Sequence, residues 1–284
     1  AGITPRRMRW QRNLSQFSGP IFFSHEKMLT ADPEVPRDRK FGLLFESQAQ
    51  APDVYRAVEP LIQEFALVFT HSDRLLRKFP NTRWIPGGGV WLEGSHGGGV
   101  SPALFPKSRN ISLISSNKLS CQAHRLRYAL AEQLETLRNG VDVFRQLPGG
   151  PNQPILLTTE TESVYLEGHV PAMEYLKEYR YSIVVENFRG KSYFTEKLMN
   201  CFASGTVPIY FGARSISQYF DAAGIIEWTS RKQLLTKVIP RLQPADYDNR
   251  SDAIMRNFKT VAGYRSIEDY IVETYSDQIL PAPR

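Results

Sequence analysis

The chain has 284 residues and a mass of 32.4 kDa, which is long for a single domain, and its apolar share of 42% suffices for two hydrophobic cores. Its net charge of +6 favours an anionic ligand, such as nucleic acid, an acidic membrane surface or a phosphorylated substrate. The longest basic cluster, residues 5–9, has no interleaved aromatic side chain, and no nucleic-acid-binding motif occurs, so nucleic acid is a poor second to a phosphorylated substrate.

The two cysteines, Cys121 and Cys201, each lie within an apolar pattern and form neither a metal motif nor a disulfide framework. We therefore expect buried thiols and a cytoplasmic protein, with peripheral contact to an anionic membrane surface compatible with its charge. No run is long and apolar enough to span a bilayer, and no secretory signal is present. Because the chain begins without Met, a lumenal protein whose N-terminal anchor was removed is the alternative.

Short apolar runs predict a first α/β unit in which polar side chains follow the strands. The expected elements are strands at Ile21–Ser24, Gly42–Phe45 and Phe65–Phe69, a helix at Asp53–Gln63, a short helix from Leu75 and an extended exit at Trp84–Pro86. Glu46 follows the second strand, at the edge where open α/β sheets bind ligands, although it could equally be a loop acid. His71 follows the third strand, either as an acid/base or acceptor ligand or as a polar strand end.

The glycine-rich segment 86–106 contains Gly87–Gly89 and Gly97–Gly99. It lacks the spacing of a phosphate-binding loop and does not join a strand to a helix. We therefore expect a mobile segment between two domains. Trp91 and His96 within it could reach an acceptor molecule.

A second α/β unit follows. The expected elements are strands at Ile111–Ile114, Val141–Phe144, Ser182–Val185, Val207–Phe211 and Gly224–Trp228, and helices at about His124–Arg138, Ala172–Tyr179, Phe194–Gly205, Ile216–Phe220 and Ile267–Tyr275. The segment Leu147–Thr161 is rich in Pro, Gly and Thr and is interpreted as an inserted loop.

The strand, turn, helix and strand between Tyr181 and Phe211 form one β-α-β unit, whose turn lies at the carboxyl edge of a parallel sheet. A helix N-terminus at that edge attracts anions. The side chains placed there are Glu186, Asn187, Arg189, Lys191, Tyr193, Thr195, Glu196 and Lys197. Cations suit a diphosphate, and carboxylates and amides suit sugar hydroxyls, so the set favours a sugar nucleotide. Solvated charge at an ordinary helix start is the alternative.

The stretch from Glu186 to Gly212 resembles the donor-binding motif of the α-1,3-fucosyltransferases, glycosyltransferase family 10. That family carries E-N-S, a short turn, Y-x-T-E-K, a helix and G-T-x-P-I-Y-W-G. This sequence matches it at Glu186–Asn187, Tyr193, Thr195–Lys197, Gly205–Thr206, Pro208–Tyr210 and Gly212. Phe188 departs from the pattern, because the family usually has Ser there. The whole resemblance spans roughly residues 41–270.

The resemblance implies a GT-B-type α/β fold, in which the parallel sheets of two Rossmann-like domains face a cleft. It divides the chain into an acceptor-binding domain at 1–106, a nucleotide-sugar domain at 107–266 and a C-terminal helix at 267–284 that packs back on the first domain. It also implies an inverting glycosyltransferase that moves L-fucose from GDP-fucose onto a hydroxyl of a glycan acceptor. A similar transferase that uses another nucleotide sugar, or a non-catalytic sugar-nucleotide-binding protein, is the alternative.

The resemblance also assigns roles. The segment 43–47 matches the family segment that carries the general base, which makes Glu46 the candidate base. The segment 115–134 is similar to one whose Arg neutralises the donor diphosphate, and its position favours Arg125 over Arg127. Arg125 and Lys197 would stabilise the leaving diphosphate. The implied donor-binding set is Ser116, Asn117, Arg125, Asn187, Tyr193, Thr195, Glu196 and Lys197, and His71 is the acceptor-binding candidate.

With these groups to place charge, no divalent metal is required as a cofactor. Asp246 and Asp248 form a D-x-D triplet, which binds metal in another class of glycosyltransferase. Here the triplet follows a proline in an expected loop, so we interpret it as surface.

Overall fold

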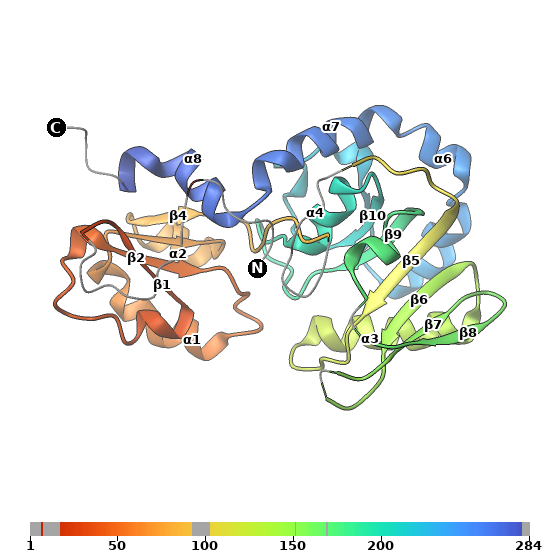
Figure 1. Cartoon of the computed structure of the whole chain (residues 1–284), viewed down its shortest axis with the longest axis horizontal. Coiled ribbons are helices and arrows are strands. Elements are labelled where there is room, and N and C mark those ends of the chain that lie inside the picture. The colour runs from red at the N-terminus through yellow and green to blue at the C-terminus, as the bar shows by residue number, and fades with distance from the viewer. Residues whose placement is uncertain (1–6, 8–17, 93–102, 151, 169, 280–284) are drawn as a thin grey trace.

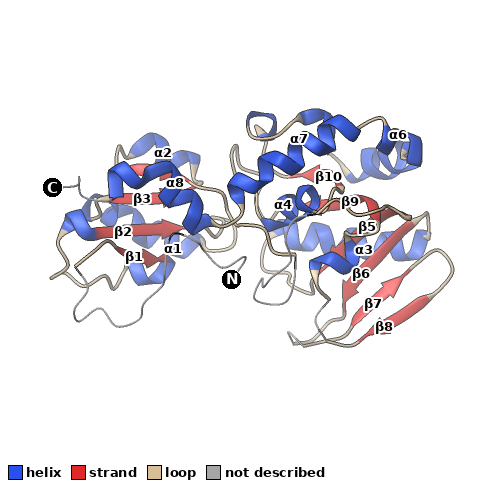
Figure 2. Cartoon of the chain, turned by 45° about the horizontal axis from the view of Figure 1, so that its top comes forward, coloured by secondary structure: helices blue, strands red, loops and turns tan. Residues whose placement is uncertain are grey.

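A computed structural model describes residues 7, 18–92, 103–150, 152–168 and 170–279 of the chain (Figure 1). It contains two separate sheets, one of four strands and one of seven. Figure 2 shows the two sheets side by side along the molecule, with the C-terminal helix α8 (Ile267–Ile279) lying on the smaller sheet. The predicted α/β architecture, with a last helix that packs back on the first sheet, is confirmed. The predicted domain boundaries stay a prediction.

The smaller sheet is fully parallel and runs in sequence order. Its strands are β1 (Ile21–Ser24), β2 (Lys40–Leu44), β3 (Leu67–Thr70) and β4 (Thr82–Trp84). Every residue of β2 and β3 is buried, which is expected for parallel strands that are covered on both faces. Helices α1 (Pro52–Val58) and α2 (Asp73–Lys78) supply the core on one face, and α8 supplies the core on the other.

The larger sheet has the order β11-β10-β9-β5-β6-β7-β8. Its strands are β5 (Arg109–Ser115), β6 (Val141–Gln146), β7 (Ile155–Thr158), β8 (Ser163–Leu166), β9 (Tyr179–Val185), β10 (Val207–Phe211) and β11 (Ile226–Glu227). From β5 the chain builds outward through β6, and then returns to place β9 on the other side of β5. The strand order therefore reverses between β5 and β9, and their carboxyl ends form the crevice where such sheets bind ligands.

Helices cover both faces of this sheet. Their bounds are α3 (Gln122–Leu137), α4 (Glu196–Ala203), α5 (Arg231–Gln233), α6 (Pro244–Asp248) and α7 (Ser251–Val261). Along β9, Ile183 and Val185 pack on the core under α3, whereas Val184 packs on the core with α4, as the two-residue period of a strand requires. The predicted β-α-β unit of β9, α4 and β10 is confirmed, with β9 and β10 parallel. Gly205 ends α4 as predicted, with a φ of +72°.

Two predicted elements differ from the structure. The segment interpreted as an inserted loop contains β7, which pairs antiparallel with both β6 and β8. This hairpin satisfies the backbone groups of the β6 edge and buries Ile155 beside Phe144. The predicted helix Ala172–Tyr179 is only a 3-10 turn at Ala172–Tyr175, because Tyr179 already begins β9 by pairing with Arg109.

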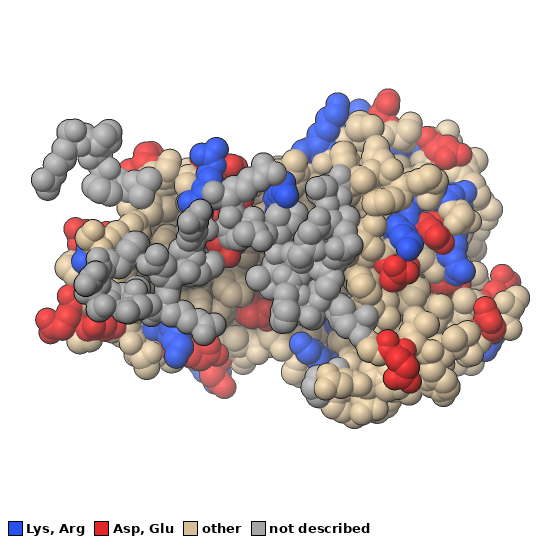
Figure 3. Space-filling view, viewed as in Figure 1, with Lys and Arg blue, Asp and Glu red and all other residues tan. Residues whose placement is uncertain are grey.

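Surface and thiol predictions were also examined against the fold. Cys121 and Cys201 are buried free thiols, as expected. Within the described ranges, no helix is sufficiently long and apolar to cross a membrane. On the face drawn in Figure 3, the described Lys and Arg side chains alternate with Asp and Glu and form no continuous basic stripe.

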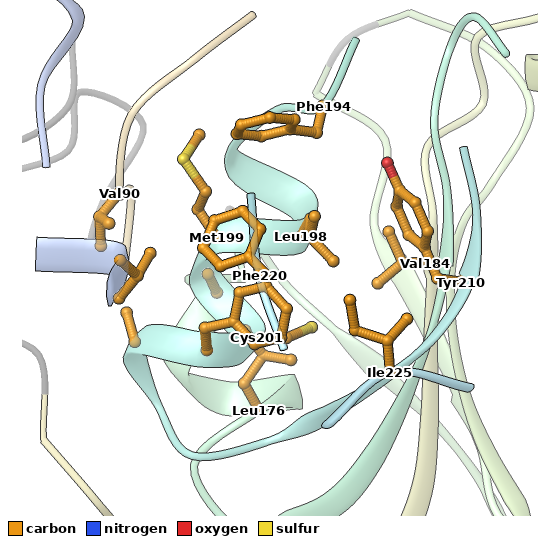
Figure 4. Packing of buried hydrophobic residues seen from close by; sticks show 14 of the residues in the cluster. Val90, Leu176, Val184, Phe194, Leu198, Met199, Cys201, Tyr210, Phe220 and Ile225 are labelled. Carbon is orange, nitrogen blue, oxygen red and sulfur yellow. The ribbon is translucent and has the colours of Figure 1, made fainter. Parts of the chain in front are cut away.

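Phe194 lies at the centre of the core beside α4 (Figure 4). Its side chain is 0% exposed, and its ring contacts the rings of Trp84, Tyr219, Phe220 and Tyr264 at centroid separations of 5.7, 5.1, 5.4 and 5.6 Å. Since Trp84 belongs to the smaller sheet and the others do not, this aromatic cluster joins the two halves of the molecule.

We expect Phe194→Ala to lower the free energy of unfolding by about 3–5 kcal/mol, because it leaves a cavity among rigid rings. Urea unfolding of wild type and variant measures the loss. Phe194→Leu, which keeps most of the volume, should cost clearly less. Equal midpoints for the wild type and Phe194→Ala would show that the cluster does not join the two halves.

Candidate functional site

A cleft of about 650 Å³ lies between the two sheets. One wall comes from the larger sheet, where the lining residues are Ser116, Lys118, His124, Arg127, Asn187, Tyr193, Thr195, Glu196 and Lys197. The opposite wall comes from the end of β2, from Gly87–Gly89 and from the start of α8, and includes Glu46. The cleft therefore opens at the strand-order reversal, where Ser116 follows β5 and Asn187 follows β9.

The turn between β9 and α4 is fixed by Glu186, whose side chain is 1% exposed. Its Oε1 accepts from the Thr195 N–H at 2.8 Å, and its Oε2 accepts from the Thr195 hydroxyl at 2.7 Å. The Thr195 oxygen in turn accepts from the Lys197 N–H at 3.3 Å and caps α4. Burial raises the pKa of Glu186, and the nearby Lys197 ammonium opposes that rise. Glu186 is thus a brace of the turn.

Lys197 and Glu196 form an ion pair at the first turn of α4, with Nζ and Oε1 2.7 Å apart. Nζ also donates to the Thr195 hydroxyl oxygen at 3.2 Å. Burial alone would lower the pKa of Lys197, but the carboxylates of Glu196 and Glu186 outweigh it and hold the pKa above its ordinary value. The ammonium therefore stays charged at the cleft wall.

The predicted phosphate-binding arginine is corrected by the structure. Arg125 is exposed, donates to the Leu119 carbonyl at 2.9 Å and does not line the cleft. Arg127 lines it, is 7% exposed, and donates to the Val185 carbonyl at 3.2 Å and the Ser116 hydroxyl at 3.3 Å. Residues two apart on a helix are separated by about 200° around its axis, so only one of the two can face the sheet edge.

Two polar atoms at this wall are buried without a hydrogen-bond partner, the Nε of Arg127 and the Oδ1 of Asn187. Buried polar atoms are nearly always paired in folded proteins, so an unpaired donor and an unpaired acceptor beside a cleft indicate a missing ligand. Burial lowers the pKa of Arg127, opposed by the carboxylates of Glu186 and Glu196. An arginine retains its proton at any physiological pH, so the site keeps this positive charge.

His124 and Lys118 also line the cleft and were not predicted. His124 lies within hydrogen-bond distance of the Ser120 hydroxyl, with Nδ1 and Oγ 3.0 Å apart. Burial, assisted by the Arg127 charge, lowers the pKa of His124 to about 4, so its ring is neutral at pH 7. Its spacing of three residues from Arg127 on α3 was the available signal, since residues i and i+3 share a helix face.

Asn117 does not line the cleft. Its Nδ2 donates to the carbonyls of Leu147, Gly149 and Gly150 at 2.9, 3.3 and 3.1 Å. It therefore braces the loop after β6, and its predicted donor-binding role is wrong.

The backbone of Glu46 is held from three sides. Its N–H donates to His25 Nε2 at 3.1 Å, and its carbonyl accepts from the Tyr55 hydroxyl at 2.8 Å and lies 3.0 Å from His71 Nε2. The carboxyl group itself faces the cleft, where Lys197 is the strongest favourable charge near it. Burial raises the pKa of Glu46 above its ordinary value.

His71 does not line the cleft and is only 2% exposed. Burial lowers its pKa to about 4, so the neutral ring donates from Nε2 to the Glu46 carbonyl. Its ring also lies 4.4 Å from the ring of Tyr193, which does line the cleft. His71 positions these two residues from behind and is not placed to contact an acceptor.

Gly87–Gly89 form a fixed strap along the cleft and are not part of a mobile segment. Gly87 N–H donates to the Phe194 carbonyl at 2.9 Å. A Cβ on Gly88 would lie 2.9 Å from the Glu196 backbone nitrogen, and one on Gly89 would lie 2.7 Å from the Arg265 carbonyl oxygen. The glycines are therefore required for close approach of the strap. Gly97–Gly99 and His96 lie outside the described residues.

The D-x-D triplet lies in α6, not in a loop. Asp246 accepts from the Tyr181 hydroxyl at 2.8 Å and pairs with Arg250 at 3.1 Å, so its oxygens are already used within the fold. Among the described residues, no group of three or more His, Cys, Asp or Glu side chains is arranged to hold a metal ion.

Comparison with known proteins gave matches of two kinds. Residues 105–242 match the family model described as "Glycosyltransferase family 10 (fucosyltransferase) C-term". A segment of 53 residues is 34% identical to the α-(1,3)-fucosyltransferase FucT of Helicobacter pylori, and one of 52 residues is 36% identical to the α-(1,4)-fucosyltransferase of Arabidopsis thaliana. These segments cover 19% and 18% of this chain, and only 11% and 13% of the two relatives.

Two solved structures share the fold. A crystal structure of an α1,3-fucosyltransferase with GDP has a TM-score of 0.54 at 12% identity, over 96% of this chain and 81% of that one. The crystal structure of TarM has a TM-score of 0.56 at 13% identity, over 90% of this chain and 52% of that one. The fold of this chain is GT-B.

We expect Arg127→Gln to weaken the binding of GDP by roughly 10- to 100-fold, the scale of losing hydrogen bonds from a charged group. The matched control is Arg125→Gln, which removes the same charge two residues away and should bind GDP normally. Isothermal titration of both variants measures the difference. A larger loss for Arg125→Gln than for Arg127→Gln would restore the original assignment.

Proposed function

Since residues 105–242 belong to glycosyltransferase family 10, we propose that this protein is an inverting glycosyltransferase that moves L-fucose from GDP-fucose onto a hydroxyl of a glycan acceptor. The observation that carries the proposal is the pair of unpartnered atoms, Arg127 Nε and Asn187 Oδ1, beside a charged Lys197 in the cleft. A diphosphate supplies acceptors for the first and third groups, and a ribose or sugar hydroxyl supplies a donor for the second.

The charge of the leaving group is matched by the wall of the larger sheet. Breaking the sugar–phosphate bond puts additional negative charge on the GDP diphosphate. Arg127, Lys197 and Lys118 line that wall, and the free N–H groups at the start of α4 add a partial positive charge. Since these groups are fixed before the reaction, they stabilise the developing charge without reorganisation.

Glu46 on the opposite wall is the proposed base. The acceptor hydroxyl gives its proton to the Glu46 carboxylate, its oxygen forms a bond to the anomeric carbon, and the bond from that carbon to the diphosphate oxygen breaks. One displacement of this kind inverts the configuration. The raised pKa of Glu46 makes its carboxylate a better proton acceptor than an exposed one, and three hydrogen bonds to its backbone fix its position.

We expect Glu46→Gln to reduce transfer by about 100- to 10,000-fold while GDP still raises the melting temperature normally, because Glu46 lies on the wall opposite the proposed diphosphate site. Glu64→Gln, which removes an exposed carboxylate from the same half of the chain, is the matched control. Transfer by Glu46→Gln at near the wild-type rate would place the base elsewhere.

The pH dependence tests the same assignment. The base must be deprotonated, so transfer falls as the pH falls through the pKa of Glu46. Because burial raises that pKa, the acid limb of the rate profile should have its midpoint above 4.5, the ordinary value. A midpoint at or below the ordinary value would contradict the assignment.

We further propose that transfer needs no divalent metal, since the side chains named above supply the positive charge. Full activity should persist in EDTA. Loss of activity on chelation, restored by Mg²⁺ or Mn²⁺, would show that a metal supplies part of the charge.

Another nucleotide sugar, or binding without catalysis, remains to be separated from this proposal. Incubation with GDP-fucose, GDP-mannose and UDP-galactose, each with measurement of released nucleotide, distinguishes the three. Release from GDP-fucose alone supports the proposed donor, release from another sugar replaces it, and binding of all without release supports a non-catalytic protein.

A further inference from the structure

Trp91 holds an exposed ring at the edge of the cleft on a rigid backbone. Its residue exposure is 40%, and it lines the cleft directly after the glycine strap. The buried side chain of Asn200, from α4, accepts from the Trp91 N–H at 2.6 Å and donates to the Trp91 carbonyl at 2.7 Å. The flanking residues are held as well, since Val90 N–H donates to the Arg265 carbonyl at 3.0 Å and the Leu92 carbonyl accepts from Met173 at 3.1 Å.

The exposure of this ring is unusual within the described part of the chain. Trp228 is 1% exposed, and Trp84 stacks on Tyr219 with ring centroids 4.7 Å apart in the central aromatic cluster. An indole that is fixed in place and still open to a cleft offers a large apolar surface at low entropic cost. Such a surface suits a ligand with one apolar face.

The other residues of this wall indicate what the ligand carries besides that face. Phe45, Ile267 and Ile271 add apolar surface, and Glu46 and Glu268 add carboxylates. Among the described residues that line the cleft, every lysine and arginine lies on the wall of the larger sheet. This wall therefore disfavours an anionic ligand and favours a neutral one with several hydroxyl groups, which the carboxylates can accept from.

We infer that Trp91 is a platform on which a neutral sugar ring of the acceptor stacks, with its hydroxyl edge directed toward the carboxylates. Sugars such as galactose present a face of C–H groups that packs on an indole, and acidic sugars would meet uncompensated carboxylates. The inference rests on the proposed glycosyl transfer and names the acceptor class for it, a neutral glycan.

The first test measures binding. Fluorescently labelled full-length protein, with saturating GDP, is applied to an array of neutral oligosaccharides printed beside the same oligosaccharides capped with sialic acid. We expect binding to a subset of the neutral glycans, and loss of most of that signal in Trp91→Ala. Trp91→Phe should retain it to within a few-fold. Tyr165→Ala, which removes a 64% exposed aromatic ring from β8, is the matched control and should bind as wild type does.

The second test uses the best glycan from the array as acceptor. Trp91→Ala should raise its KM by about 10- to 100-fold, with a smaller change in kcat and an unchanged KM for GDP-fucose. The melting temperature and its shift with GDP should also stay unchanged, which separates lost stacking from misfolding.

The outcomes separate this inference from the proposed function. If GDP gives no melting shift in the wild type, the proposed donor site fails. If GDP binds but the array signal is absent, falls only on the sialylated glycans or is equal in Trp91→Ala, the platform is overturned while the donor site stands.

Discussion

The site depends first on the two hydrogen bonds from Thr195 to the buried carboxylate of Glu186. They close the turn that joins β9 to α4, and they satisfy a buried charge with a backbone donor and a hydroxyl donor. Because the turn has one conformation, Tyr193 and Lys197 enter the cleft at fixed positions. Replacing Glu186 by an apolar residue would leave the Thr195 hydrogen-bond donors without partners and free the start of the helix.

The second constraint is the interlocking of the two sheets around the cleft. Trp84 donates from its indole nitrogen to the Ser192 carbonyl at 3.1 Å, and the Lys191 N–H donates to Asp73 at 3.0 Å. Together with the glycine strap, these bonds join the smaller sheet to the same turn that carries the cations. The two walls are therefore held in a defined relation through the β9–α4 turn, which allows a carboxylate on one wall to act on a bond broken at the other.

Buried histidines have a supporting role in this arrangement. His25 accepts from the Glu46 N–H, and His71 donates to the Glu46 carbonyl. Burial lowers the pKa of both rings, so both are neutral at pH 7 and each keeps the tautomer that its bond requires. The base is thus placed by neighbours that do not themselves reach the cleft.

The sequence alone determined the order of strands, the β-α-β unit from Tyr181 to Phe211 and the residues at its turn, because apolar period and turn residues are local properties. It also placed Glu46 at a strand end. Only the tertiary structure decided between Arg125 and Arg127, since the choice depends on which face of α3 meets the sheet. It likewise assigned Asn117 and His71 to bracing roles and Trp91 to the cleft, because these roles depend on partners as far away in sequence as Asn200, which no local pattern specifies.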